Sequence, residues 1–396
     1  MIKLTFLGDI MCEGPFLEAA MKQDGGWDFD SAFSGMKALL AGSDYVVGNF
    51  ETPLAGEEAG YSRTRDLYSF NTPDCFADAV RDMGVDLALT ANNHCCDRGI
   101  DGLKRTLKAL DDAGLRHTGT FDNPDENEPA VIQVGGERIA VIACTATTNA
   151  LRTGCEPSGE NVNLLQRQVS GIGRMPPHKA LKTIFIRRVL GEGNYLKIRT
   201  MLGKSPKKAT VDSRCDPEAM APYLAALEEL VHKARERADL VIVCPHMGGQ
   251  FNRTPGRFSE YVMERLVEMD ADAVVASHPH IVQKVERRKN VPCAYSLGNV
   301  SMSMSTAYII RDDLPDYGMA LHLYVDGHRI VRTTCSLLIM QETQDGYLRV
   351  RPLVDAAAEA SDSERIRMLE NARVVMRRIR QDSELTFSDI AEEFEL

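Results

Sequence analysis

Carboxylate, amide and imidazole side chains recur directly after short apolar runs of this sequence. They are Asp9, Asn49, Glu51, Asn93, His94, His246, His278 and His280. Carboxylate and amide oxygens suit hard cations such as Mg²⁺ and Mn²⁺, whereas imidazole nitrogens suit Zn, Fe, Mn and Ni. A mixed oxygen and nitrogen set leaves room for water and substrate, and a bound metal lowers the pKa of its water to about 7. The residue types therefore indicate a hydrolytic metal centre.

The apolar runs have the length and composition of buried β-strands. Seven of them are prominent: IKLTFLG, YVVGNF, VDLALTA, RIAVIACTA, LVIVCPH, AVVASHPH and CAYSLGNV. Helical patterns lie between them, and the spacing of Leu103, Leu107 and Leu110 predicts a helix that ends at Gly114. Strands that alternate with helices predict a largely parallel sheet covered on both faces. Ligands gather at the carboxyl ends of such strands, so five strands would direct these polar groups to one edge.

Each of these residues also has an ordinary structural interpretation. Asp9 after a glycine is typical of a turn or helix cap, Asn93 of a cap, and Glu51 of a surface charge. A single histidine is more often a hydrogen-bonded structural residue than a ligand. The shared position at strand ends favours the metal centre over these separate explanations.

The charge and composition of the whole chain exclude several classes of function. The 396 residues carry a formal net charge of −11 and a pI near 5.4, opposite in sign to a non-specific nucleic-acid binder. No apolar stretch reaches the roughly eighteen residues needed to span a bilayer, and no secretory signal is recognisable. We therefore expect a cytoplasmic protein without a membrane anchor, whose ten cysteines are reduced. No phosphate-loop or dinucleotide-binding motif occurs, so no nucleotide cofactor is expected.

The alternation of strands and helices breaks between residues 151 and 210. This stretch has 12 Lys or Arg against 3 Asp or Glu, and is either a solvated surface excursion or a basic lid that recruits an anionic substrate. Further on, Asp326-Gly327 predicts a hairpin turn, and a helix from Ser363 leads to a peripheral acidic end. We divide the chain into residues 1–150, a basic insertion at 151–215, residues 216–345, and a C-terminal helical tail at 346–396.

Six motifs, in order, resemble one known family. They are FLGDIM, VVGNFETPL, ANNHCCDRGIDGL, CPHMGGQF, SHPHIVQ and YSLGN. Over about residues 2–300 the chain resembles the poly-γ-glutamate capsule biosynthesis protein CapA family, within the calcineurin-like metallophosphoesterase superfamily. The resemblance implies an α/β fold, a four-layer α/β/β/α sandwich of two mixed β-sheets flanked by helices. Residues 1–150 and 216–345 would then be two parts of one metallophosphoesterase domain.

The resemblance also implies which residues bind metal. Asp9 and His280 would hold one divalent ion. Asn93, His246 and His278 would hold a second. The metal would be Mn, Fe, Zn or Mg, bound as one or two ions.

A bridging ligand and a general acid follow from the same resemblance. Glu51, or Asn49 beside it, would bridge the ions, and Asp9 would share in catalysis as a ligand. His94 would protonate the leaving oxygen, a role that suits histidine because its ordinary pKa lies near neutrality. The broader superfamily has a histidine at the position of Met11 and an aspartate at that of Asn49. Both changes remove ligand strength, so we expect one ion to bind weakly or not at all.

Other polar residues near the motifs are candidates for weaker roles. Four arginines in loops after ligand motifs could clamp an anionic group, with a plain surface position as the alternative: Arg63, Arg65, Arg98 and Arg253. Asn299 in YSLGN could orient His280 through a hydrogen bond. Five histidines outside the motifs are not expected to be ligands: His117, His178, His232, His322 and His328.

Three functions fit these residues. The first is hydrolysis of a phosphoester or similar bond, with metal-bound hydroxide attacking and His94 as general acid. The second is hydrolysis of an amide in a γ-glutamyl polymer or peptide. The third is a non-catalytic accessory protein of poly-γ-glutamate capsule synthesis, which would call for an anchor or extracellular address. We favour an enzyme that acts on an anionic small molecule or polymer.

Overall fold

The computed structural model describes residues 1–64, 69–169, 211–306, 308–343 and 346–396. Most of the basic insertion, together with Arg65 and His178, lies outside these ranges. The strands are β1 (Ile2–Ile10), β2 (Tyr45–Phe50), β3 (Leu87–Leu89), β4 (Arg116–Thr118), β5 (Ala130–Val134), β6 (Glu137–Thr145), β7 (Leu240–His246), β8 (Ala273–Val275), β9 (Val285–Arg288), β10 (Val291–Ala294), β11 (Asn299–Ser301), β12 (Tyr317–Val325), β13 (Ile330–Glu342), β14 (Leu348–Pro352) and β15 (Phe394–Glu395). The α-helices are α1 (Gly14–Ala20), α2 (Asp30–Phe33), α3 (Lys37–Ala41), α4 (Cys75–Met83), α5 (Gly99–Asp112), α6 (Ala150–Thr153), α9 (Pro217–Arg237), α10 (Arg257–Glu268), α11 (Leu353–Glu359) and α12 (Asp362–Arg380). Among the described residues, no helix is long and apolar enough to cross a membrane.

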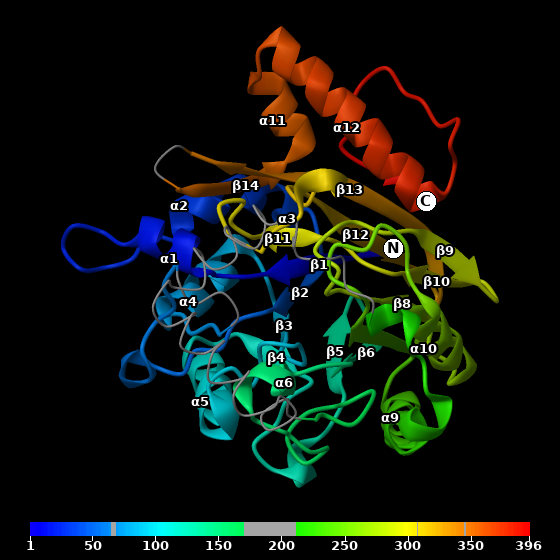
Figure 1. Ribbon diagram of the computed structural model, residues 1–396. Helices are drawn as coiled ribbons and strands as arrows, with labels where there is room; N and C mark the ends of the chain where they lie inside the picture. Colours follow the sequence, from blue (N-terminus) through cyan, green and yellow to red (C-terminus); the bar gives the residue numbers. More distant parts are fainter. Residues whose placement is uncertain (65–68, 170–210, 307, 344–345) are drawn as a thin grey trace.

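Two mixed β-sheets lie at the centre of the described part of the chain (Figure 1). Within that part, the larger sheet has nine strands in the order β14-β13-β12-β1-β2-β3-β4, with β11 beside β1 and β15 beside β13. The smaller sheet has six described strands in the order β5-β6-β7-β8-β10-β9. Strands β1 to β4 are parallel, as are β6, β7 and β8. The predicted parallel arrangement is therefore correct for the strands that lead to most of the ligand-type residues. Strands β12, β13 and β14 pair antiparallel to their neighbours, which agrees with the hairpin predicted at Asp326-Gly327 and makes the sheet mixed, as the resemblance implied.

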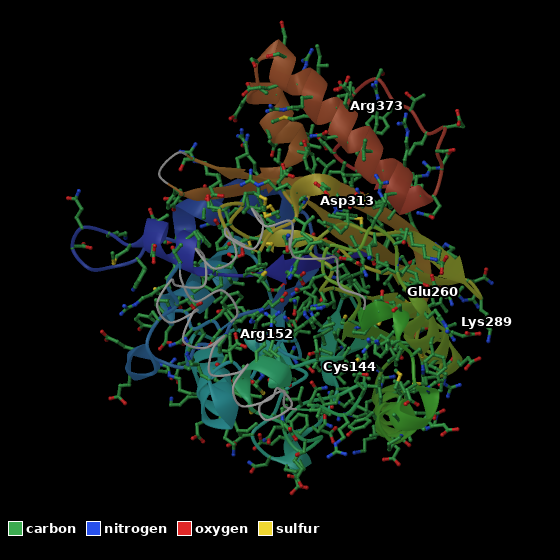
Figure 2. The ribbon with its side chains drawn as sticks, viewed as in Figure 1. Cys144, Arg152, Glu260, Lys289, Asp313 and Arg373 are labelled. Atoms are coloured by element: carbon green, nitrogen blue, oxygen red, sulfur yellow. The ribbon has the colours of Figure 1, made fainter. Side chains whose placement is uncertain are left out.

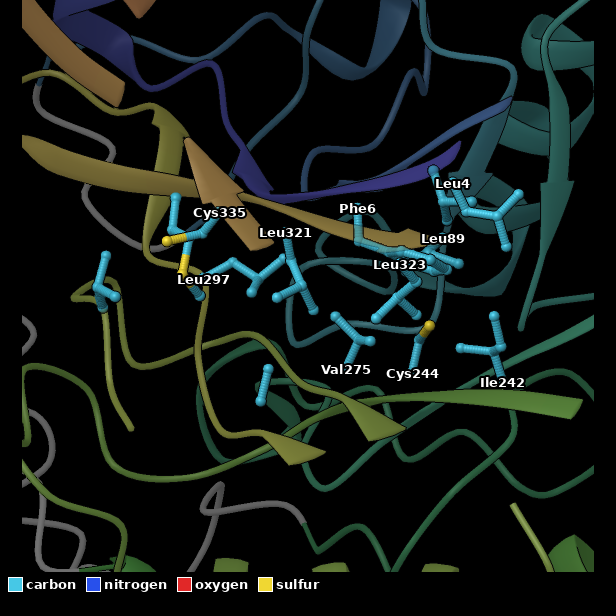
Figure 3. Packing of buried hydrophobic residues seen from close by; sticks show 14 of the residues in the cluster. Leu4, Phe6, Leu89, Ile242, Cys244, Val275, Leu297, Leu321, Leu323 and Cys335 are labelled. Carbon is cyan, nitrogen blue, oxygen red and sulfur yellow. The ribbon is translucent and has the colours of Figure 1, made fainter. Parts of the chain in front are cut away.

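Alternate residues of the central strands face different layers. On β1, Leu4 faces a core between the two sheets, whereas Leu7 packs with residues of the outer helices α1, α2 and α4. On β7, Ile242 enters the same central core and Val243 packs against α9 and α10. Figure 3 shows side chains from both sheets meeting in the central core. This helix–sheet–sheet–helix order confirms the four-layer architecture that the resemblance implied.

Two local predictions concern glycines, and both are confirmed in outline. Helix α5 ends before Gly114, whose φ of 70° is left-handed, and the Leu115 N–H donates to the Leu110 carbonyl at 2.9 Å. The hairpin joins β12 to β13, but its turn lies one residue later than predicted. Gly327 and His328 both have positive φ, at 57° and 60°, so they form the two-residue loop.

The acidic C-terminal end lies at the surface, but it also pairs with the nine-stranded sheet, which the sequence did not predict. Helix α12 begins with a capping box formed by Ser361 and Glu364. Beyond it, β15 pairs with β13, and the carboxylate of Glu393 accepts a hydrogen bond from Tyr324 Oη at 2.7 Å. A two-residue strand leaves no periodic signal, so this contact could not be read from the sequence. The proposed divisions at residues 150, 215 and 345 stay predictions.

Gly8 lies where β1 and the segment before β11 come closest. A Cβ atom at residue 8 would lie 1.9 Å from the Gly298 carbonyl oxygen. We expect Gly8→Ala to lower the free energy of unfolding by about 1–3 kcal/mol, because the backbones must move apart. Gly159→Ala is the matched control, since nothing lies within 4 Å of its added Cβ. Urea denaturation measures both variants, and equal stabilities would contradict the expectation.

Candidate metal centre

The sheet register brings the ends of three strands of the nine-stranded sheet together. Asp9 on β1 is paired with Asn49 on β2 and with Asn299 on β11, and Glu51 directly follows β2. The remaining ligand-type residues end or follow β3, β7 and β8: Asn93, His94, His246, His278 and His280. Asp9, Glu51 and His280 are fully buried, and none of the other five ligand-type residues is more than 5% exposed. The two sheets thus bring all eight of these side chains to one buried region.

Asp9, Glu51 and His280 form the first potential ligand cluster. One ligand atom of each lies within 4.8 Å of the others. His280 Nδ1 is 3.1 Å from Asp9 Oδ2. The Asn49 amide donates to Asp9 Oδ1 at 2.7 Å and to Glu51 Oε2 at 3.0 Å. Asn49 therefore orients the two carboxylates of this cluster.

Glu51, His246 and His278 form the second potential cluster, within the same 4.8 Å limit. His246 Nε2 is 3.0 Å from His278 Nδ1 and 3.6 Å from Glu51 Oε1. Asn93 Oδ1 is 2.8 Å from the same His246 nitrogen. On its other side, His246 Nδ1 is 2.9 Å from Ser277 Oγ. Glu51 is thus the one residue that both clusters share.

The arrangement of polar atoms fits a cation. Glu51 Oε1 and His280 Nε2 are buried and have no hydrogen-bond partner in the structure. Burying a polar atom without a partner costs free energy, and burying an uncompensated charge costs more. A divalent ion among these oxygens and nitrogens would satisfy both atoms, and the donor set is one that Mn, Fe or Zn accepts.

The pKa shifts of the ligand-type residues also fit a bound cation. Burial raises the pKa of Asp9, but the hydrogen bond and charge of His280 more than offset this and leave it below the ordinary value. Burial and the neighbouring Asp9 raise the pKa of Glu51 well above its ordinary value. Burial, together with nearby histidines, lowers the pKa of His246 strongly and that of His278 to about 3. Without metal, burial thus favours the protonated form of Glu51 and the neutral form of both histidines, which is the form that binds metal.

The backbone around the two histidines after β8 has an uncommon conformation. His278 and His280 have φ values of 106° and 58°, on either side of Pro279. Positive φ at residues other than glycine costs free energy and is concentrated at functional sites. Asn299 holds this turn, because its amide donates to the His280 carbonyl at 2.9 Å and its oxygen is 3.0 Å from His280 Nδ1.

His94 lies beside the clusters, held by residues that sequence reasoning missed. Its Nδ1 is 2.6 Å from Asp97 Oδ2, which also accepts the Phe70 N–H at 2.7 Å. The Phe70 ring stacks on the imidazole with centroids 4.0 Å apart. His94 Nε2 is 4.0 Å from Glu51 Oε1. Asp97 follows three residues after His94 in the ANNHCCD motif. This spacing was the sequence feature that could have indicated a contact between the two side chains. No comparable sequence feature indicated that Ser277 contacts His246.

The candidate arginines have contacts outside the two clusters. Arg98 Nη2 donates to the Gly60 carbonyl at 3.3 Å, and Arg253 Nε is 3.2 Å from Asp313 Oδ1. Asp313 is labelled in Figure 2. The Arg253 side chain is 61% exposed, and Arg63 is also exposed. Their contact with a substrate stays a prediction, and Arg65 lies outside the described residues.

Comparison with known proteins places the chain near capsule synthesis proteins. The family model described as bacterial capsule synthesis protein PGA_cap matches residues 3–303. The capsule biosynthesis protein CapA of Bacillus anthracis is 27% identical over 302 residues, which cover 75% of this chain and 59% of that protein. The PGA biosynthesis protein CapA of Bacillus subtilis strain 168 is 24% identical, with 75% and 62% covered. The chain thus spans less than two thirds of either CapA relative.

Two further matches concern proteins whose names state no activity. Protein y4sH of Sinorhizobium fredii is 25% identical over 344 residues, covering 83% of this chain and 72% of that protein. The crystal structure of TT1561 of Thermus thermophilus matches with a TM-score of 0.37 and 10% identity, covering 81% and 94%. The fold assignment rests on the two sheets themselves. The resemblance predicted from the six motifs is confirmed by the family match and the CapA relatives.

The buried histidines predict how the stability of the metal-free protein depends on pH. The pKa of His278 is lowered from 6.5 to about 3. Between these values the unfolded chain binds a proton that the folded protein does not, so stability falls as pH falls below about 6.5. The slope is at most about 1.4 kcal/mol per pH unit for each such histidine.

Urea denaturation of chelator-treated protein between about pH 7 and about pH 5 measures this slope. We expect His278→Gln to reduce it, because glutamine does not titrate. His232→Gln, on the exposed side of α9, is the matched control and should keep the wild-type slope. A slope unchanged in His278→Gln would contradict the prediction.

Proposed function

Because the chain belongs to the bacterial capsule synthesis protein PGA_cap family, we propose that it is a metal-dependent hydrolase of a phosphoester or similar bond. Asp9 and His280 would hold one divalent ion, and His246 and His278 a second, with Asn93 beside them. Glu51 would bridge the two. The observation that carries this proposal is the position of Glu51, which belongs to both clusters and has a buried oxygen without a hydrogen bond.

Bound divalent ions would supply Lewis acidity and water of lowered pKa at the centre. The chain's own residues hold that environment in place. Asn49 fixes Asp9 and Glu51 from one side, and Asn299 fixes His280 from the other. Complete burial of these groups keeps bulk water away, which strengthens each electrostatic interaction with a reacting group.

His94 is the proposed general acid. Asp97 accepts from Nδ1–H, so the proton to be delivered is carried on Nε2, which lies on the side of Glu51. The Asp97 carboxylate stabilises the protonated ring, and Phe70 holds its plane. His94 would give this proton to the leaving oxygen of the substrate, and Asp97 acts as a positioning residue.

An anionic substrate would be bound at the edge of the centre by arginines. Arg63, Arg98 and Arg253 are the described candidates, and Arg253 would exchange its contact with Asp313 for the substrate. The names of the CapA relatives refer to capsule and PGA biosynthesis. For this chain they favour amide hydrolysis in a γ-glutamyl polymer as the second candidate reaction, with the same residues in the same roles.

The first test combines metal content with hydrolysis. Protein purified without chelator is analysed for bound metal and assayed on an aryl phosphate ester with added Mn²⁺. We expect His246→Ala to lose both metal and activity. His94→Ala should keep its metal and lose activity by about 10²- to 10⁴-fold. His232→Ala, on the exposed side of α9, is the control that should change neither.

Each other outcome has a definite meaning. Metal without ester hydrolysis would shift the proposal to the amide of a γ-glutamyl polymer, assayed next. No bound metal after reconstitution would contradict the hydrolase and leave an accessory protein.

Asp97 gives a separate prediction about positioning. Asp97→Asn keeps the size of the side chain but removes the charge that stabilises a protonated His94. We expect kcat to fall about 10- to 100-fold, with metal content and KM unchanged. Asp101→Asn, in the first turn of α5, is the matched control. A kcat equal to that of the control would contradict the positioning role.

A further inference from the structure

We propose a second divalent-metal site, of the zinc type, formed by Glu137, Asp239 and His328. One ligand atom of each residue lies within 4.8 Å of the others. Glu137 is the first residue of β6, Asp239 directly precedes β7, and His328 lies in the turn between β12 and β13. The site is independent of the proposed hydrolytic centre, since Asp239 and His246 lie at opposite ends of β7, about 23 Å apart along the strand.

The contacts among the three residues are already close. The His328 N–H donates to Glu137 Oε1 at 3.2 Å, which fixes the turn against the start of β6. His328 Nδ1 is 2.5 Å from Glu137 Oε2 and 3.8 Å from Asp239 Oδ2. Three protein ligands of the types His, Glu and Asp are sufficient for Zn²⁺, with water in the fourth position.

Glu137 is the residue that points to a ligand. It is only 8% exposed, and its buried Oε2 has the His328 imidazole nitrogen as its close neighbour, with no further hydrogen-bond partner. His328 Nδ1, a nitrogen that can bind metal, therefore faces this carboxylate oxygen directly. A cation held by Glu137 Oε2 and His328 Nδ1 would compensate the negative charge of the buried carboxylate. It would also accept one lone pair from the oxygen and one from the nitrogen.

Arg138 competes for one of the ligands. Its Nη2 donates to Asp239 Oδ1 at 2.8 Å and its backbone N–H to Oδ2 at 2.9 Å. These hydrogen bonds lower the pKa of Asp239 to about 2, so the carboxylate is ionised at neutral pH. The Arg138 side chain is 52% exposed and can turn into solvent. Removing its guanidinium should therefore strengthen metal binding at this site.

A metal here would join the two sheets. His328 belongs to the β12–β13 hairpin of the nine-stranded sheet, whereas Glu137 and Asp239 belong to the six-stranded sheet. The link would lie at the ends of β6 and β7 away from the hydrolytic centre. Its role would be to stabilise the packing of the sheets, and we expect no direct part in catalysis.

Equilibrium dialysis against Zn²⁺, followed by elemental analysis, tests the site by stoichiometry. His328→Asn removes the imidazole but tolerates the left-handed φ of 60° at this position. We expect it, and Glu137→Gln, to bind one equivalent fewer than the wild type. His117→Asn is the matched control, because His117 pairs with Asp111 outside both sites. Any zinc at the hydrolytic centre is common to all variants and cancels in the comparison.

Arg138→Ala distinguishes a metal site from a simple ion pair. We expect this variant to bind the additional zinc severalfold more tightly, and to gain more thermal stability from zinc than the wild type does. His328→Asn should lose that zinc-dependent gain. Equal zinc stoichiometry in the wild type and His328→Asn would overturn the proposal. Weaker zinc binding in Arg138→Ala would also overturn it.

Discussion

The carboxylate of Glu51 is buried between two groups of ligand-type side chains, and its charge must be neutralised there. Asp9 beside it is ionised, so a second carboxylate in the same place is strongly disfavoured, and this raises the pKa of Glu51. Burial disfavours the charged forms of His246 and His278, so these two histidines offer little compensating charge. The fold therefore favours a proton on Glu51 or a cation beside it. A proton and a metal ion would compete for this position, so the affinity for a metal would depend on pH.

The scaffold supplies these groups from two different sheets. Asp9 and Glu51 come from the nine-stranded sheet, whereas His246 and His278 come from the six-stranded sheet. The apolar core between the sheets sets the distance between the two pairs (Figure 3). The close approach of Gly8 to the Gly298 carbonyl brings β1 and β11 together at the same end. Because a cation would contact ligands of both sheets, metal binding and sheet packing would stabilise each other.

The sequence located the ligand-type residues because parallel strands end at a common edge, and a polar residue after an apolar run shows where each strand ends. The sequence could not decide whether Asn49 or Glu51 would be the bridging ligand, since that depends on which side chain lies between the clusters. Asp97 was missed because it follows His94 by three residues in a turn, where no regular periodicity shows which side chains meet. The β15 contact was missed because two residues carry no periodicity, and the turn at Gly327 was displaced because positive φ at His328 has no sequence signal. Local rules thus predicted positions along the chain, and three-dimensional packing determined the pairings.

The two ligand groups differ in composition, and Met11 explains part of the difference. Where the resemblance leads to a histidine, this chain has a fully buried methionine that packs among the outer-helix residues. The group around Asp9 and His280 is left with two carboxylates and one imidazole, which favours a harder ion such as Mn²⁺. The group around His246 has two imidazoles, one carboxylate and the Asn93 amide, which favours Zn²⁺ or Fe²⁺. Glu51 would couple the two, because an ion in either group would displace its proton and leave the carboxylate ionised for the other. Unequal affinity and cooperative filling would then follow from the same shared residue.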